Sequence, residues 1–147
     1  QHAIELLFAA EESLRRAEPS TNIAKLRLGK TAISHLVDTS QAQADLEQAV
    51  AVINRLEKFD PTDQSAPRLS IEDFGTAKFT VPGVPLGFGF RDALAPLIRK
   101  DFDRTAATIE RIASPSVRGV CRLEAAKQLL DSLSPLESKR EIAGSGQ

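Results

Sequence analysis

Apolar residues recur at intervals of three or four along most of the chain, a spacing that predicts amphipathic helices. Breaks rich in serine, aspartate and proline separate these stretches and predict the helix boundaries. We expect about six helices: three over residues 1–17, 21–37 and 41–58, and three that begin after Asp92, Asp101 and Ser114. The predicted fold class is mainly α, with antiparallel helical hairpins arranged as a solenoid or a bundle.

Each predicted helix has one apolar stripe, and the six stripes together give the predicted core. In chain order they are Ile4, Leu7, Phe8 and Leu14; Ile23, Leu26, Ile33, Leu36 and Val37; Leu46, Ala49, Val50, Ile53 and Leu56; Leu94, Leu97 and Ile98; Phe102, Ala106, Ile109 and Ile112; and Val117, Val120, Leu123, Ala126 and Leu130. These stripes predict a single helical domain over residues 1–133.

Residues that favour helix caps stand at the predicted N-termini. They are Ser20 or Thr21, Ser40 with Gln43 in a capping-box pattern, Asp92, Asp101, and Ser114 before Pro115. The last helix is predicted to end near Leu133, because Pro135 disfavours a helical conformation at Ser134. Residues 134–147 are polar and are predicted to form a flexible tail.

A non-helical insert is predicted over about 59–90, where prolines and glycines interrupt the helical pattern. A short β-ribbon, with strands over 68–71 and 77–81, is one prediction for its interior. Four of the seven phenylalanines of the chain fall in the insert: Phe74, Phe79, Phe88 and Phe90. Three interpretations stay open: the rings pin the insert to the helices, they form an apolar surface that recognises a partner, or the insert is disordered.

Two segments align without gaps, residues 45–56 and residues 101–112, and four of their twelve positions are identical. The shared helical period explains such a match as well as a duplicated helical hairpin does. The second segment continues from Asp101-Phe102 through an alanine-rich helix and a Ser114-Pro115 turn to a helix ending in Leu129-Leu130.

This second unit resembles a recurring unit in helical proteins, mainly acidobacterial, that are built of tetratricopeptide-like hairpins and have no established activity. Residues 21–58 resemble a related unit, so the resemblance covers about half of the chain. It implies an all-helical, repeat-like fold.

The charges nearly balance, with 19 basic and 20 acidic side chains, which gives no reason to expect a nucleic-acid partner. The longest uncharged stretch, 79–90, is broken by proline and glycine, so we expect no membrane span. One cysteine and two histidines provide neither a disulfide framework nor a standard zinc site. The chain lacks methionine, even at position 1, so we expect a fragment, a processed form or an altered sequence, and we expect any targeting signal to lie outside it.

Three local patterns suggest chemistry, and none is complete. Gly29-Lys30-Thr31 copies the end of a phosphate-binding loop, but Ala24 stands where the first glycine is needed. His35 is predicted to be a structural histidine on a helix, and Cys121 a small buried hydrophobe. The sequence therefore predicts no catalytic, cofactor-binding or metal-binding residue.

The preferred functional prediction is a non-catalytic interaction or scaffold module whose partner is a protein. The alternative is a helical domain that binds a small molecule, as a sensor or an enzyme, through a site not readable from the sequence. A deep pocket with converging charged groups would favour the alternative, and a shallow concave face would favour the scaffold.

Overall fold

The computed structural model describes residues 1–62 and 89–144, with side chains described as far as Leu133. Six helices and no strand lie in these ranges, which confirms the mainly α fold. The helices are α1 (His2–Arg16), α2 (Thr21–Ser34), α3 (Thr39–Ile53), α5 (Phe90–Lys100), α6 (Phe102–Glu110) and α7 (Pro115–Gly144). The two predicted strands lie outside the described residues.

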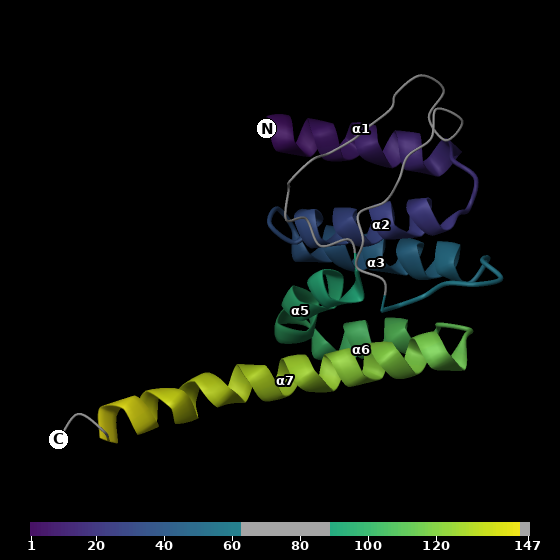
Figure 1. Cartoon of the computed structure of the whole chain (residues 1–147). Coiled ribbons are helices and arrows are strands. Elements are labelled where there is room, and N and C mark those ends of the chain that lie inside the picture. The colour runs from purple at the N-terminus through teal and green to yellow at the C-terminus, as the bar shows by residue number, and fades with distance from the viewer. Residues whose placement is uncertain (63–88, 145–147) are drawn as a thin grey trace.

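The helices stack in layers, as Figure 1 shows. α1 is outermost, the antiparallel pair α2 and α3 lies beneath it, and α5, α6 and α7 form the opposite side. α5 contacts α2, α3, α6 and α7, whereas α1 packs mainly on α2. No helix among the described residues has the length and apolar character needed to cross a membrane.

The main apolar core lies between the α2–α3 pair and the three later helices. Its most deeply buried aliphatic side chains include Leu28, Leu46, Leu94, Leu97, Ile98, Ile112 and Val117. Phe90 is also buried there and packs edge-on against Phe59, with ring centroids 6.0 Å apart and an interplanar angle of 89°. The predicted stripes of α3 and α5 are thereby confirmed, with Leu56 packed at the edge of the core.

Three of the predicted caps are confirmed. Ser20 accepts a hydrogen bond from the Ile23 amide at 3.1 Å, and the Asp101 carboxylate accepts one from the Arg104 amide at 3.2 Å. Ser114 accepts a longer bond, 3.4 Å, from the Val117 amide, and α7 begins at Pro115 as expected.

Two predicted caps were wrong. α3 is capped by Asp38, whose carboxylate accepts the Ser40 amide at 2.9 Å, so the helix begins before the predicted cap Ser40. A carboxylate at this end also interacts favourably with the helix dipole. α5 begins at Phe90 after Gly89, and Asp92 lies in its first turn. Burial of Phe90 in the core accounts for the earlier start.

Three predicted helix ends also need correction. α2 ends at Ser34 and α3 at Ile53, each a few residues earlier than the apolar pattern suggested. α7, in contrast, continues through Pro135 to Gly144. Proline removes one backbone donor, and the leucine, glutamate, lysine and arginine that follow are strong helix formers. The flexibility expected of residues 134–147 stays a prediction.

Candidate functional site

α2 buries polar side chains on the face that points toward α1. Nine of its 14 residues are buried, because α1 covers one side and α3 and α5 cover the other. Arg27, Lys30 and Ser34 lie on this face at the i, i+3, i+7 spacing of one helix stripe. The predicted apolar stripe of α2 was wrong at its end, since Leu36 is 82% exposed and Val37 is 47% exposed.

These side chains join carboxylates from α1 and α3 in what we call the ionic cluster: Glu11, Arg27, Lys30, Ser34 and Asp45. The Lys30 ammonium lies 2.7 Å from Asp45 Oδ1 and 3.3 Å from Glu11 Oε2. Arg27 Nη1 also donates to Glu11 Oε2 at 3.3 Å, and the Ser34 hydroxyl donates to Asp45 Oδ2. The charges of two positive and two negative side chains therefore cancel in the space between α1, α2 and α3.

The ionic cluster is nearly dry. The side chains of Lys30 and Arg27 are each 6% exposed and that of Asp45 is 4% exposed, whereas Glu11 is 19% exposed. Removing charges from water is costly unless they are paired and hydrogen-bonded. Each charge of the cluster has an opposite partner, but the buried Arg27 Nε has no hydrogen-bond partner among the described residues. Among the described residues, no group of three or more His, Cys, Asp or Glu side chains is placed to hold a metal ion.

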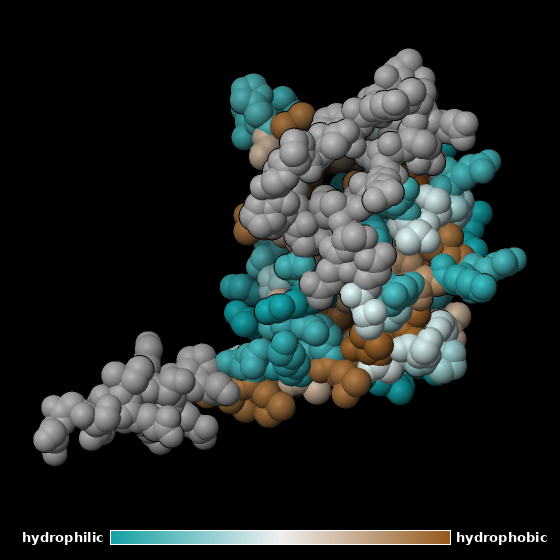
Figure 2. Space-filling model, in the orientation of Figure 1, coloured by the Kyte–Doolittle hydropathy of each residue, from teal (hydrophilic) through white to brown (hydrophobic). Residues whose placement is uncertain are grey.

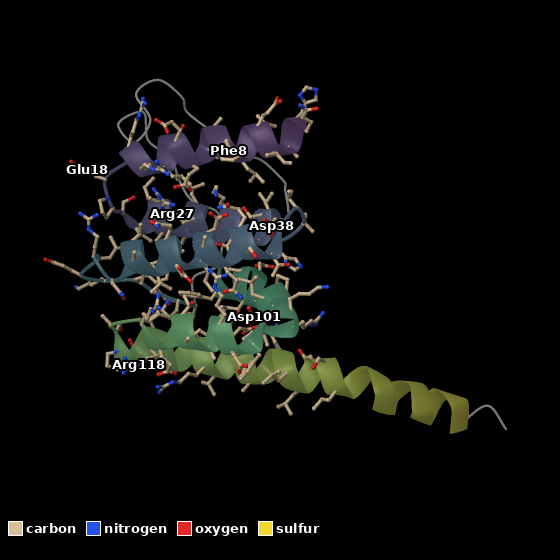
Figure 3. All side chains as sticks on the ribbon, turned by 180° about the vertical axis from the view of Figure 1, so that it is seen from behind. Phe8, Glu18, Arg27, Asp38, Asp101 and Arg118 are labelled. Atoms are coloured by element: carbon tan, nitrogen blue, oxygen red, sulfur yellow. The ribbon has the colours of Figure 1, made fainter. Side chains whose placement is uncertain are left out.

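A pocket of about 210 Å³ lies beside the ionic cluster, between α1 and the turn that joins α2 to α3. We call it the α1 pocket. Ile4, Leu7 and Phe8 form its wall on α1, and Lys30, Ser34 and Gln41 are among its polar lining residues. Figure 3 shows Phe8 on α1, Asp38 at the turn between α2 and α3, and Arg27 between α1 and α2.

α7 exposes an apolar stripe that the sequence pattern assigned to the core. Val117 is buried as predicted, but the helix then buries Cys121, Ala125 and Gln128, while Leu123 is 73% exposed and Leu130 is 65% exposed. Small residues on the buried side let α7 pack closely on α5 and α6. Apolar residues are visible along this helix at the edge of the molecule in Figure 2.

The exposed residues of this stripe are Leu123, Ala126, Leu130 and Leu133, which we call the α7 outer face. Their spacing of three, four and three is that of the a and d positions of a coiled-coil heptad. A groove of about 230 Å³ runs alongside between α6 and α7, lined by Phe102, Ile109 and Leu129 among others.

An exposed ion pair flanks this groove. Arg122 donates to both oxygens of Glu110, through Nε at 2.7 Å and through Nη2 at 2.5 Å. The hydrogen bond from Arg122 lowers the pKa of Glu110 and raises that of Arg122 itself. This bidentate contact ties α6 to α7 beside the groove.

The structure places one of the four predicted interaction residues. Phe90 is 3% exposed and lies in the core, which favours the packing interpretation for this ring. Phe74, Phe79 and Phe88 lie outside the described residues, so their role as an interaction surface stays a prediction. The sequence did not predict the buried ionic cluster or the exposed α7 outer face.

Two of the three local patterns that suggested chemistry have structural roles, and His35 is half-buried at the C-cap of α2. Gly29-Lys30-Thr31 lies inside α2, and Lys30 belongs to the ionic cluster. Cys121 is fully buried, and this burial raises the pKa of its thiol to about 12, so the residue acts as a small hydrophobe. The aligned aspartates differ, because Asp45 is buried within α3 whereas Asp101 caps α6, and the duplication stays a prediction.

Comparison with known proteins found no matching family model, no matching curated protein and no matching solved structure. The resemblance to tetratricopeptide-like helical proteins therefore stays a prediction.

Proposed function

We propose that this chain is a non-catalytic interaction module that binds a short apolar helix of a partner protein along the α7 outer face. The exposure of its leucines carries the proposal: Leu123, Leu130 and Leu133 are 73%, 65% and 64% exposed. Single exposed leucines are ordinary on protein surfaces. A row of them at heptad spacing is typical of surfaces that bind helices.

The size of the α7 outer face suggests the size of the partner. In the sequence, the next heptad positions after Leu133 are Glu137 and Arg140, so the apolar row ends there. From Leu123 to Leu133 a helix rises about 15 Å, or roughly three turns. The groove beside Phe102 and Leu129 would take an anchoring side chain of that partner.

Selection from a displayed library of amphipathic helical peptides, followed by fluorescence anisotropy, tests the proposal. We expect the selected peptides to bind Leu130→Ser at least tenfold more weakly than wild type, since anchors in such interfaces contribute about 1.4 kcal/mol or more. Leu36→Ser is the matched control, because Leu36 is even more exposed, at 82%, and lies at the α2–α3 turn. Both substitutions should change the free energy of unfolding by less than about 0.5 kcal/mol. If the selected peptides bind Leu130→Ser as tightly as wild type, the α7 outer face is not their binding site.

A further inference from the structure

The α1 pocket has the size of a site for a small molecule. A cavity of about 150 Å³ holds a benzene ring in other proteins, and the α1 pocket measures about 210 Å³. It therefore has room for one ring with a short substituent, or for a short alkyl chain. None of its lining residues belongs to α6 or α7, so it is separate from the α7 outer face.

The polar side of the pocket is a rigid, built surface. Lys30 and Ser34, which line it, are 7% and 0% exposed and are both bonded to Asp45. Gln41 donates to the same carboxylate through Nε2 at 3.0 Å, which leaves its amide oxygen available as an acceptor. Ligand pockets commonly combine such a fixed polar side with an apolar wall, here Ile4, Leu7 and Phe8.

The charge of the lining distinguishes between ligands. Among the described residues, three charged ones line the pocket, Glu11, Lys30 and Asp38, and their charges sum to −1. Lys30 is already paired with Asp45 and Glu11, whereas Asp38 uses only Oδ1, which accepts the Ser40 amide. An entering carboxylate would meet two carboxylates and a lysine that is already neutralised. An entering ammonium would meet the Asp38 carboxylate, whose full negative charge outweighs the partial positive charge at the N-terminus of α3.

We infer that the α1 pocket binds a small organic amine. Its ammonium group pairs with the Asp38 carboxylate and the Gln41 amide oxygen, and its apolar body lies against Leu7 and Phe8 on α1. The Phe8 ring adds an aromatic surface in the same lining, and such rings attract ammonium groups.

A matched series of three probes tests this inference: 2-phenylethylamine, 2-phenylethanol and phenylacetate. They share an apolar body and carry a positive, a neutral and a negative group. In an NMR titration of the full chain, we expect the amine to give saturable shifts at the amides of Leu7, Val37 and Gln41. Phenylacetate should bind at least tenfold more weakly than the amine, and the alcohol should lie between them.

Two pairs of variants locate the site. Phe8→Ala should weaken amine binding about fivefold or more, whereas Leu6→Ala should not, although both side chains are 71% exposed. Asp38→Asn keeps a good capping residue and should reduce the preference for amine over alcohol about fivefold, as expected for a partly exposed ion pair. Asp103→Asn, on exposed α6 surface, should leave that preference unchanged.

The inference is overturned if no probe gives saturable shifts, or if all three bind equally well. Amine binding that is unchanged in both Phe8→Ala and Asp38→Asn would overturn it as well, because the amine would then occupy another site. None of these outcomes bears on peptide binding at the α7 outer face.

Discussion

Charged groups lie in the interior between α1 and the α2–α3 pair, whereas apolar side chains fill the interior between that pair and α5, α6 and α7. Among the residues whose burial is described, the buried charged ones all lie on α2 or α3: Lys25, Arg27, Lys30 and Asp45. In the second region the buried polar residues are the neutral Thr105, Thr108 and Gln128.

The difference follows from what α1 offers to α2. Leu14 is its single buried residue among those described, so apolar burial cannot hold α1 in place. Glu11 supplies that hold through Arg27 and Lys30. The stability of such an ionic contact depends on how individual charged atoms are paired. The stability of the apolar region depends on the total apolar area that it buries.

The largest effect is expected from breaking the ionic cluster. Asp45→Ala removes the carboxylate that pairs with Lys30 and accepts from Ser34. We expect it to lower the free energy of unfolding by about 3–5 kcal/mol, because it leaves a buried ammonium poorly compensated. Denaturant melts measure this loss.

The double variant Lys30→Met/Asp45→Leu shows whether charge pairing is the cause. It removes both charges, so it should be less destabilised than Asp45→Ala alone. Glu47→Ala is the control for an exposed pair, since Glu47 and Arg104 lie 3.3 Å apart at the surface, and it should cost less than about 1 kcal/mol. A double variant as unstable as the single one would contradict the ionic account.

In the apolar region, we expect alkaline pH to lower the free energy of unfolding through the buried Cys121 thiol. Burial, with a smaller contribution from Glu124, raises the pKa of the Cys121 thiol from 9.0 to about 12. The folded state therefore keeps a proton that the unfolded state releases above about pH 9. The stabilisation that comes from this protonated thiol is fully present below about pH 9. Above it, the free energy of unfolding falls by about 1.4 kcal/mol per pH unit as the pH rises toward about 12.

Urea melts between about pH 9 and pH 11 measure this slope against Cys121→Ala, which has no thiol to titrate. Wild type should lose stability more steeply than the variant, and equal slopes would show that the thiol is not protected. Thiol-reactive dyes provide a second measurement, because Cys121 should react slowly until the protein unfolds.

A smaller effect is expected at the boundary between the two regions. Gln43 is 1% exposed and donates from Nε2 to the Thr105 hydroxyl at 2.8 Å. Gln43→Ala should cost about 1–3 kcal/mol through the lost hydrogen bond and the space left behind. Gln48→Ala, at an exposed position of α3, should stay within about 0.5 kcal/mol of wild type by the same melts.

The smallest effect is expected at Gly119, on the side of α7 that carries the α7 outer face. An added Cβ there would meet nothing within 4 Å, and glycine within a helix is unfavourable. Gly119→Ala should therefore stabilise the free protein by about 0.5–1 kcal/mol. A loss of stability in thermal melts would show that this side of α7 is already covered in the free protein.

The sequence predicted best where a helix has one buried face. The α3 stripe through Leu46, Ala49 and Ile53 is buried as expected, and the caps at Ser20 and Asp101 are where residue type alone placed them. In these cases local propensity and tertiary packing favour the same answer.

The prediction was wrong where a helix has more than one face that can be buried. α7 has apolar residues on two sides, and the choice of the Cys121 side over the Leu123 side depends on how closely α5 and α6 approach. α2 carries Arg27 and Lys30 on a covered face, where a polar pattern usually indicates solvent. The available signal was the i, i+3, i+7 spacing of Arg27, Lys30 and Ser34.

The bonds between α3 and α6 have a mechanical consequence. Asn54 donates to the Arg111 carbonyl at 2.9 Å and accepts from the Ala113 amide at 2.8 Å, while Gln43 bonds to Thr105 about 16 Å away along α3. A force that shears α3 against α6 acts at once on the hydrogen bonds of Asn54 and of Gln43, at the two ends of this contact. A force that peels α1 away loads the contacts of Glu11 with Arg27 and Lys30 at a single point, so α1 is expected to yield first under tension.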